Sequence, residues 1–430
     1  MRERLDGAWV EGQVARTCAA WEACAVGSVH GGPRYGVEEQ VRREREYDAA
    51  LGVVESEVKR LPGAGRVWIA AQERMTLAFA RFAGAALDLE EDAVHLLTGD
   101  FVPAGIQLSR WARRFDDGLS MAEIVQASRN AWTACGLQSL LGERVGLTPS
   151  ILGYSLLYPY TDNFLDCVEL DAEEKRRMGE RFGRRLEGEA VAAQNRREAV
   201  LWALVGVIEG QYGRAEYDQV YECLLAIHRA QEGSVAQMVR RPEAAEVLRI
   251  SCAKGGSSVL ADGCLVRGWL TEVESEFCFD WGVLLQLGDD LQDVREDLQR
   301  GSATLFTSAA AAGVPLDGLT RQLLGFSEQI SCNMDETMQG TAMLKNLLRT
   351  SWRSLIVGAV ADSHEFFSAG FLREMEQCSP FRFEFLRARR GRLASREGLF
   401  TQVFSAFLEG TEGDLDLPVP ALGLHEFLTT

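Results

Sequence analysis

The chain has 430 residues with 47% apolar and 25% charged side chains, as in an ordinary globular protein, but only 10 residues are proline. Strands joined by hairpins need turns rich in glycine and proline every 8–12 residues or so, so the scarcity of proline excludes an all-β fold and favours long helices. The formal net charge of −18 at pH 7 argues against nucleic acid as a partner, because such binding depends on Lys and Arg that neutralise phosphates.

The predicted secondary structure is helical after an irregular first stretch of about forty residues. Apolar side chains spaced by three and four from Tyr47 to Leu61 indicate a helix that Pro62 ends. Ser120 and Thr271 are each followed by a glutamate three residues later, and these capping boxes open two further helices. The predicted helices span 47–61, 120–142, 148–166, 173–188, 195–210, 216–232, 243–265, 271–301, 317–348 and 350–376.

Two local irregularities are expected within these helices. Pro159 removes a backbone donor and should kink the helix over 148–166. Gly255-Gly256 should interrupt the helix over 243–265. The helix that begins at Thr271 is expected to run unbroken to Gly301, because glycine is a natural C-terminal stop.

The helical pattern predicts an all-α protein, built as a large antiparallel helical barrel or bundle. Residues 1–145 form an N-terminal helical region of unclear role, residues 146–410 the main helical domain and residues 411–430 a C-terminal tail. The chain begins without an apolar signal segment and contains no transmembrane-length apolar stretch. Its ten cysteines show no metal-ligand spacing, which predicts reduced thiols and a cytoplasmic location.

An acidic stripe marks the helix over 271–301. At about 100° per residue, Asp289, Asp293 and Asp297 lie within about 80° of one another. Gly282 and Gln286 share this face, and apolar residues flank it where a solvated stripe would have lysines and arginines. Aspartates at this spacing repel one another and weaken a helix. The pattern therefore indicates that cations lie between the carboxylates.

A second acidic face lies near the end of the helix over 148–166, where Asp162, Asp166 and Glu169 share one side. Two such faces on separate helices can meet across a cavity and hold Mg²⁺, which prefers carboxylate and water oxygens and often bridges to phosphate. For Asp162 and Asp166 alone, an exposed acidic stripe is the favoured interpretation. A di-iron carboxylate site is excluded, because none of the five histidines has the Glu-x-x-His spacing.

The sequence around these aspartates resembles class I isoprenoid synthases over about residues 150–310. The run Gly282-Val-Leu-Leu-Gln286-Leu-Gly-Asp289-Asp290-Leu-Gln-Asp293 is similar to the second aspartate-rich motif of trans-isoprenyl diphosphate synthases. The run from Asp293 through Asp297 to Arg300-Gly301 is similar to a segment of squalene and phytoene synthases. Asp162-Asn-Phe-Leu-Asp166 resembles the first aspartate motif, and Lys254-Gly255-Gly256 resembles a segment that reaches the diphosphate.

The resemblance implies the class I fold, with residues 146–410 as the catalytic domain and a deep apolar pocket that has several Mg²⁺ ions at its mouth. The implied metal ligands are Asp162, Asp166, Asp289, Asp290, Asp293 and Asp297, of which Asp162, Asp166, Asp289 and Asp293 are also the implied catalytic residues. The implied diphosphate ligands are Lys254, Arg300 and Gln286. Aromatic side chains would shield a carbocation from water, and the candidates are Tyr154, Tyr158, Phe164, Phe277 and Trp281.

The function that the resemblance implies is that of a terpene synthase, a lyase that ionises a linear isoprenyl diphosphate and cyclises or quenches the carbocation. Two departures disfavour chain elongation. Asn163 stands where elongating synthases usually have an aspartate, and the nearest match to their Gly-Gly-Lys-x-x-Arg-Pro segment, Gly31-Gly32-Pro33-Arg34, lies far before Asp162. The alternatives are a squalene- or phytoene-type condensing prenyltransferase, a chain-elongating prenyl diphosphate synthase and a non-catalytic helical binding protein.

One basic, aromatic cluster stands out near the C-terminus of this acidic chain. It suits a peripheral contact with anionic lipid or with substrate phosphate, although a solvated helix face is the favoured interpretation. The cluster consists of Phe381, Phe383, Phe385, Arg387, Arg389, Arg390 and Arg392. The sequence leaves the oligomeric state open, although synthases of this kind are often homodimers.

Overall fold

The computed structural model describes residues 4–24, 32–60, 68–87, 89, 91–166, 171–235, 243–394, 417 and 419–420. Within these residues every regular element is a helix and no strand occurs, which confirms the all-α prediction. Nor does any helix among them have the length and apolar character needed to cross a membrane.

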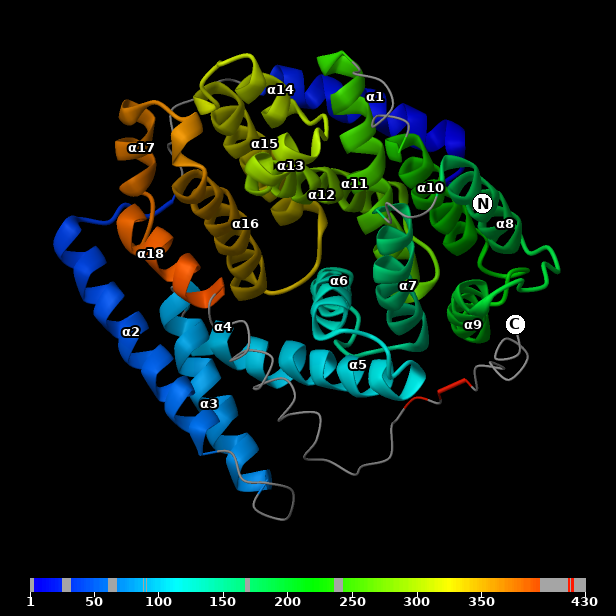
Figure 1. Cartoon of the computed structure of the whole chain (residues 1–430), viewed down its shortest axis with the longest axis horizontal. Coiled ribbons are helices and arrows are strands. Elements are labelled where there is room, and N and C mark those ends of the chain that lie inside the picture. Colours follow the sequence, from blue (N-terminus) through cyan, green and yellow to red (C-terminus); the bar gives the residue numbers. More distant parts are fainter. Residues whose placement is uncertain are drawn as a thin grey trace.

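The helices, shown in Figure 1, are α1 (Gly7–Ala23), α2 (Val37–Lys59), α3 (Trp68–Leu87), α4 (Glu91–Leu96), η1 (Leu97–Phe101), α5 (Val102–Phe115), α6 (Met121–Leu140), α7 (Pro149–Asp166), α8 (Ala172–Leu186), α9 (Arg196–Gln211), α10 (Asp218–Val235), α11 (Ala244–Arg267), α12 (Glu272–Gln292), α13 (Val294–Arg300), α14 (Leu305–Ala311), α15 (Asp317–Thr337), α16 (Ala342–Asp362), η3 (His364–Phe366), α17 (Ala369–Glu376) and α18 (Phe383–Ala394).

Local capping chemistry sets the ends of the helices that carry the candidate site. The Ser120 hydroxyl accepts a hydrogen bond from the backbone N–H of Glu123, whose carboxylate accepts one in return, so α6 begins with the predicted capping box. Thr271 and Glu274 form the same motif at the start of α12. Gly301, with a φ of 77°, ends α13 in the left-handed conformation that favours glycine. These three predictions are confirmed.

The N-terminal stretch that was expected to be irregular contains a helix of 17 residues, α1. Asp6 caps it by accepting hydrogen bonds from two backbone N–H groups of the first turn. Trp9 packs edge-on against Phe279, with ring centroids 6.2 Å apart, and Trp21 packs in the same way against Phe326 at 5.9 Å. The helix is thus stabilised by contacts with residues far along the chain.

The predicted interruption at Gly255-Gly256 is wrong, because α11 is continuous from Ala244 to Arg267. The two glycines lie where α11 packs closely against α12. A methyl group on Gly255 would lie 2.5 Å from the carbonyl oxygen of Gly282, well inside van der Waals contact. The missing side chains therefore let the two helices approach, and this pair has the most extensive helix–helix contact in the described structure.

Three helices predicted to be continuous are divided. Asp293, with φ −94° and ψ 9°, separates α12 from α13, so the helix over 271–301 is not unbroken. The helix expected over 317–348 ends at Thr337, because Gly340 adopts a φ of 91° and Thr341 caps a new helix, α16. The helix expected over 350–376 ends at Asp362, and α17 begins at Ala369 after Ser368 caps it.

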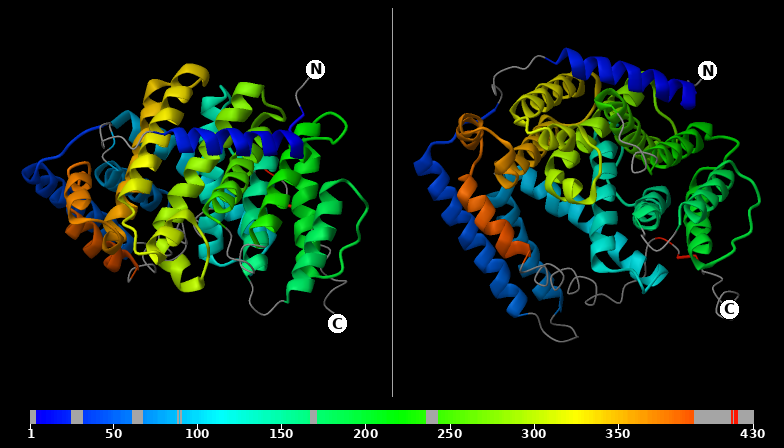
Figure 2. Two further views of the ribbon diagram at one scale, coloured as in Figure 1. Left: turned by 90° about the horizontal axis from the view of Figure 1, so that it is seen from above. Right: turned by 45° about the horizontal axis from the view of Figure 1, so that its top comes forward.

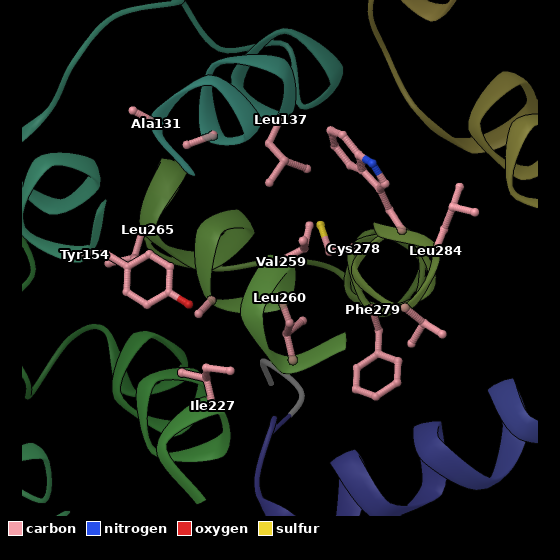
Figure 3. Packing of buried hydrophobic residues seen from close by; sticks show 14 of the residues in the cluster. Ala131, Leu137, Tyr154, Ile227, Val259, Leu260, Leu265, Cys278, Phe279 and Leu284 are labelled. Atoms are coloured by element: carbon pink, nitrogen blue, oxygen red, sulfur yellow. The ribbon is translucent and has the colours of Figure 1, made fainter. Parts of the chain in front are cut away.

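Helices α11 and α12 lie at the centre of the molecule. Figure 3 shows apolar side chains of α6, α7, α10 and α12 meeting around α11. Helix α1 lies across α10, α11, α12 and α15 and is visible along one face in both views of Figure 2. One cluster of buried apolar side chains extends from Leu5 to Phe383, and it includes residues on both sides of the domain boundary predicted at residue 145.

The basic, aromatic cluster predicted near the C-terminus is packed against the α2–α3 pair at the edge of the molecule (Figure 1). Phe381 and Phe385 stack against each other and both contact Tyr47 edge-on. Arg389 forms an ion pair with Asp48 and is only 15% exposed. The favoured interpretation of a solvated helix face is therefore wrong for these residues. The side chains of Arg390 and Arg392 lie outside the described part of the chain.

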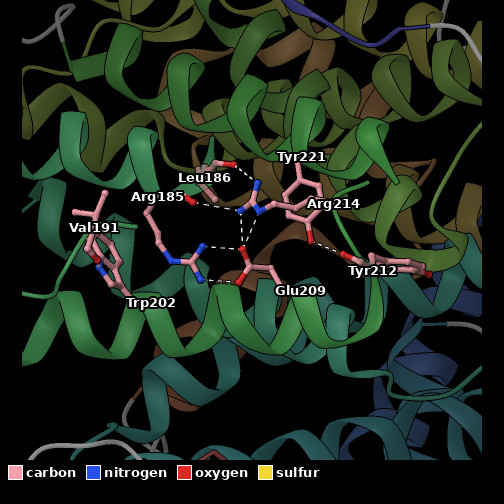
Figure 4. A network of polar contacts seen from close by, with 8 residues as sticks. All are labelled: Arg185, Leu186, Val191, Trp202, Glu209, Tyr212, Arg214 and Tyr221. Atoms are coloured by element: carbon pink, nitrogen blue, oxygen red, sulfur yellow. Dashed lines mark hydrogen bonds and ion pairs between the residues drawn. The ribbon is translucent and has the colours of Figure 1, made fainter. Parts of the chain in front are cut away.

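A polar network fixes α8, α9 and α10 relative to one another (Figure 4). The Glu209 carboxylate accepts hydrogen bonds from Arg185 at 2.6 Å and from Arg214 at 2.8 Å. Arg214 also lies over the Tyr221 ring, 3.9 Å from its centroid. Burial would raise the pKa of Glu209, but the hydrogen bonds from both arginines lower it. The network holds α9 in place along α7, the helix of the first aspartate motif.

Candidate active site

The three aspartates of the predicted stripe remain on consecutive turns despite the break between α12 and α13. The backbone N–H of Asp293 donates to the carbonyl oxygen of Asp289 at 2.8 Å, and that of Asp297 donates to the carbonyl of Asp293 at 2.9 Å. The backbone thus keeps helical hydrogen bonds from the end of α12 into α13. As a result, three carboxylates follow one another at intervals of one turn.

The stripe is electrostatically unfavourable in the absence of a cation. Burial, followed by the charges of Asp289, Glu296 and Asp297, raises the pKa of Asp293 to about 6, while the more weakly acting charge of Arg129 opposes this shift. Burial and the charge of Asp289 also raise the pKa of Asp297, while Arg300 acts in the opposite direction. Within the described residues, the Asp293 carboxylate has no hydrogen-bond donor and no ion-pair partner. Asp293 is therefore a half-buried anion among other anions.

Two cations from neighbouring helices approach the stripe. The Arg129 guanidinium of α6 lies 3.6 Å from an Asp289 oxygen, with its side chain 63% exposed. Lys254 of α11 is half-buried, and its charge lowers the pKa of both Asp290 and Asp297. The sequence pattern predicted Lys254 near the stripe, but it gave no signal for Arg129, because the contact joins residues 160 positions apart on different helices.

Asp290 lies on a different side of α12 from the stripe. One of its carboxylate oxygens accepts a hydrogen bond from the Ser251 hydroxyl at 3.0 Å, and the other accepts one from the Gln286 amide at 2.8 Å. The side chain is buried, and burial raises its pKa to about 7. This placement favours a role in joining α11 to α12. It does not favour the predicted roles of Asp290 as a metal ligand and of Gln286 as a diphosphate ligand.

The first aspartate motif lies in the last turn of α7. The side chains of Asp162 and Asp166 and the whole of Glu169 lie outside the described part of the structure, so their approach to the stripe stays a prediction. Asn163 donates a hydrogen bond to Glu123 of α6 at 2.8 Å. Since α6 also carries Arg129, one helix contacts both the first motif and the stripe.

The predicted wall residues fall into two groups. Phe277 and Trp281 are buried on α12, where the Trp281 ring lies 5.8 Å from that of Trp352 on α16. Phe164 lies beneath the Arg197 guanidinium at 4.8 Å. Phe164 and Tyr158 line two small neighbouring cavities between α7, α8 and α10. Tyr154, the fifth candidate, lines one of these cavities together with Tyr158. The structure therefore does not place all five rings around one cavity.

A buried polar group lies between α6, α7 and α11. The Asn130 amide donates to the Ser155 hydroxyl at 3.1 Å and to one Asp262 oxygen at 3.0 Å. The second Asp262 oxygen is buried without a partner in the described structure, and burial raises the pKa of this carboxyl well above its ordinary value. No sequence signal reveals this polar group, because a single aspartate within an apolar run does not form a motif.

A cavity with a volume of about 520 Å³ lies between α1, α10 and α11 and is larger than the two small cavities beside α7. Its floor is apolar, and its charged rim pairs arginines with glutamates, as in Arg4 with Glu222 and Arg249 with Glu11. None of the three cavities is lined by the stripe aspartates.

Among the described residues no three His, Cys, Asp or Glu side chains are close enough to hold one metal ion together. No protein-family model matches this sequence, and neither the curated proteins nor the solved structures include a significant match to it. The all-helical class is therefore established by the structure, while a relation to isoprenoid synthases rests on the motifs.

The charge repulsion at Asp293 leads to a prediction about stability. In metal-free buffer at pH 7.5, Asp293→Asn is expected to raise the free energy of unfolding by about 1 kcal/mol. This value is smaller than the energy that corresponds to the full pKa shift, because solvent screens the charge of a half-buried group. The folded pKa of about 6 lies above the unfolded value near 3.8, so the wild-type chain loses stability as the pH rises through this interval.

Urea unfolding at several pH values measures this difference. The gain in the free energy of unfolding should be absent below about pH 4, where Asp293 is protonated in both the folded and the unfolded chain. It should be complete above about pH 7. An equal gain at every pH would mean that asparagine acts through packing and not through charge.

Proposed function

We propose that the chain is a Mg²⁺-dependent, terpene-synthase-like enzyme that ionises a linear isoprenyl diphosphate to a carbocation and releases diphosphate. The observation that carries this proposal is the stripe of Asp289, Asp293 and Asp297, in which a half-buried carboxylate has only like charges around it on its own helices. A chain does not gain stability from such an arrangement. A cation bound between these carboxylates would offset their mutual repulsion.

The donor chemistry of the stripe fits Mg²⁺. Asp293 has no partner among the described side chains, and the ion pair of Asp289 with Arg129 is long and exposed. Mg²⁺ commonly takes one or two protein carboxylates and completes its shell with waters and substrate phosphates. Asp289, Asp293 and Asp297 would hold it from α12 and α13, and Asp162 and Asp166 from α7. When bound, Mg²⁺ supplies the positive charge that stabilises a diphosphate leaving group.

Protein cations would act beside the metal. Lys254 and Arg129 approach the stripe from α11 and α6, and Arg300 ends α13 within reach of the charge of Asp297. As the bond between carbon and the diphosphate oxygen lengthens, negative charge grows on that oxygen, and fixed cations nearby lower the barrier. The buried rings of Phe277 and Trp281, on the same helix as Asp289, would keep the allylic cation away from water.

The experiment is an incubation of the purified chain with single prenyl diphosphates of ten to twenty-five carbons, with Mg²⁺ or with chelator. We expect diphosphate release only with Mg²⁺, together with a hydrocarbon or alcohol of unchanged carbon number. A product of doubled carbon number would identify a condensing prenyltransferase, and a product lengthened only when isopentenyl diphosphate is added would identify a chain-elongating synthase. No Mg²⁺-dependent release from any substrate would contradict the enzymatic proposal and favour a binding protein.

A further inference from the structure

Two pairs of cysteines lie close together in the structure. All nine cysteines among the described residues are free thiols. The sulfurs of Cys18 on α1 and Cys252 on α11 are 3.8 Å apart, and those of Cys223 on α10 and Cys264 on α11 are 3.1 Å apart. The first pair joins segments 234 residues apart in sequence. The pairs differ in their surroundings more than in their distances.

The environment of Cys18 differs from that of a core thiol. It is half-buried, whereas Cys223, Cys252 and Cys264 are buried. The contact with the Cys252 thiol and the positive charge of Arg249 lower the pKa of Cys18, against the effect of its partial burial. The same contact and burial raise the pKa of Cys252. Cys18 is thus the more exposed thiol of the pair and the one whose pKa is lowered, which favours it as the attacking sulfur, with Cys252 as the neighbour placed to resolve it.

The cavity between α1, α10 and α11 is lined by residues close to this pair in sequence, although neither sulfur-bearing residue lines it. Val14 and Ala253 both line the cavity. Cys18 follows Val14 by one helical turn on α1, and Cys252 immediately precedes Ala253 on α11. Cys18 itself is partly exposed on α1, so a small oxidant can reach it from solvent. Cys223 and Cys264, buried on the facing sides of α10 and α11, have no comparable exposure.

We propose that Cys18 and Cys252 form a redox modification site, at which hydrogen peroxide converts two thiols into one disulfide between α1 and α11. The Cys18 thiolate attacks peroxide, the O–O bond breaks, and Cys18 becomes a sulfenic acid while hydroxide leaves and is protonated to water. The Cys252 sulfur then attacks the Cys18 sulfur, the S–O bond breaks and a second water leaves. Overall, two thiols lose two electrons to one peroxide, which yields two waters.

The geometry needs only a small adjustment for the second step. A disulfide requires the sulfurs to approach to about 2.05 Å, and rotation of the Cys18 side chain about its own bonds can cover most of the remaining gap. The cross-link would fasten α1 to the segment of α11 that holds Ser251 and Lys254. This site rests on the proximity of the two sulfurs and on the partial exposure of Cys18, and it does not depend on the proposed activity.

The test is peptide mass spectrometry of the full chain after treatment with hydrogen peroxide, alkylation of free thiols and digestion without reductant. We expect one cross-linked peptide pair that contains Cys18 and Cys252, two fewer alkylated thiols, a higher Tm and full reversal by dithiothreitol. Cys223 and Cys264 provide a control within the same molecule, because they are closer together yet should remain reduced. The variants Cys18→Ser and Cys252→Ser should each abolish the cross-link and the rise in Tm.

Three results would overturn the proposal. One is oxidation of Cys18 to sulfinic or sulfonic acid while Cys252 stays alkylatable, since that would show that Cys252 does not resolve the sulfenic acid. Another is equal cross-linking of Cys223 to Cys264, because proximity alone would then explain the reaction. The third is the absence of any Cys18–Cys252 peptide in wild-type chain that remains folded by circular dichroism, a measurement that does not depend on how well the variants fold.

Discussion

Asp293→Asn is expected to lower Mg²⁺-dependent diphosphate release by about 100-fold or more, because it removes a charged oxygen ligand from the centre of the stripe. The same substitution relieves the repulsion from Asp289 and Asp297, so the variant should be at least as stable as the wild type in metal-free buffer. A loss of activity together with unchanged or higher stability would separate a role in the site from a role in folding. Steady-state diphosphate release and urea unfolding measure the two quantities.

The matched control is Glu272→Gln, which removes one negative charge from an exposed side chain in the first turn of the same helix, about 20 residues away. This variant should keep its activity within about twofold. If Asp293→Asn retained most of the Mg²⁺-dependent release, the stripe would not be the metal site, and the proposed function would lose the observation that carries it.

Gly282→Ala is expected to lower the free energy of unfolding by about 3 kcal/mol, because α11 and α12 pack backbone against backbone at this point. A methyl group on Gly282 would overlap the carbonyl of Gly255 and contact Gly256. Neither obstacle is a flexible side-chain end that could move aside. The helices would have to separate along the contact that positions Ser251, Lys254 and the stripe.

Gly206→Ala is the control for Gly282→Ala. Gly206 also lies inside a helix, α9, but a methyl group there would meet no atom within 4 Å. Alanine should therefore raise the free energy of unfolding by about 0.5 kcal/mol through its better helix propensity. Chemical denaturation of both variants tests whether their free energies of unfolding change in opposite directions. Similar changes in the free energy of unfolding for the two variants would show that close packing at Gly282 does not determine the effect of Gly282→Ala.

Most helices of this fold can be predicted from the sequence, because their signals are local. The capping boxes at Ser120 and Thr271 and the stop at Gly301 involve residues within one turn of each other. Helix α1 shows that such signals can also be overlooked. Asp6 is an ordinary cap, and Val10, Val14 and Trp21 are buried at helical spacing. Small and polar residues between them make this spacing less distinct.

The features of the fold and the site that the sequence does not reveal share one physical cause, which is that they depend on partners distant in sequence. Gly255-Gly256 suggests a helix break until Gly282 is known to lie opposite. Asp290 resembles its neighbour Asp289 in the sequence, yet its side chain accepts a hydrogen bond from the Ser251 hydroxyl and lies between α11 and α12. Periodicity predicted that Asp289, Asp293 and Asp297 share a face. It could not predict that Arg129 would reach that face from α6.

Helix α1 also has a consequence for synthesis of the chain. Arg16 forms two hydrogen bonds to the buried Asp280, at 2.9 and 2.8 Å, across 264 residues of sequence. At about 5–20 residues per second, the ribosome needs roughly 15 to 50 s to add the surface on which α1 docks. During this interval Trp9 and Trp21 have no native partner. Helix α1 thus emerges long before the surface that covers it, and chaperones that bind exposed aromatic segments would meet the nascent chain there.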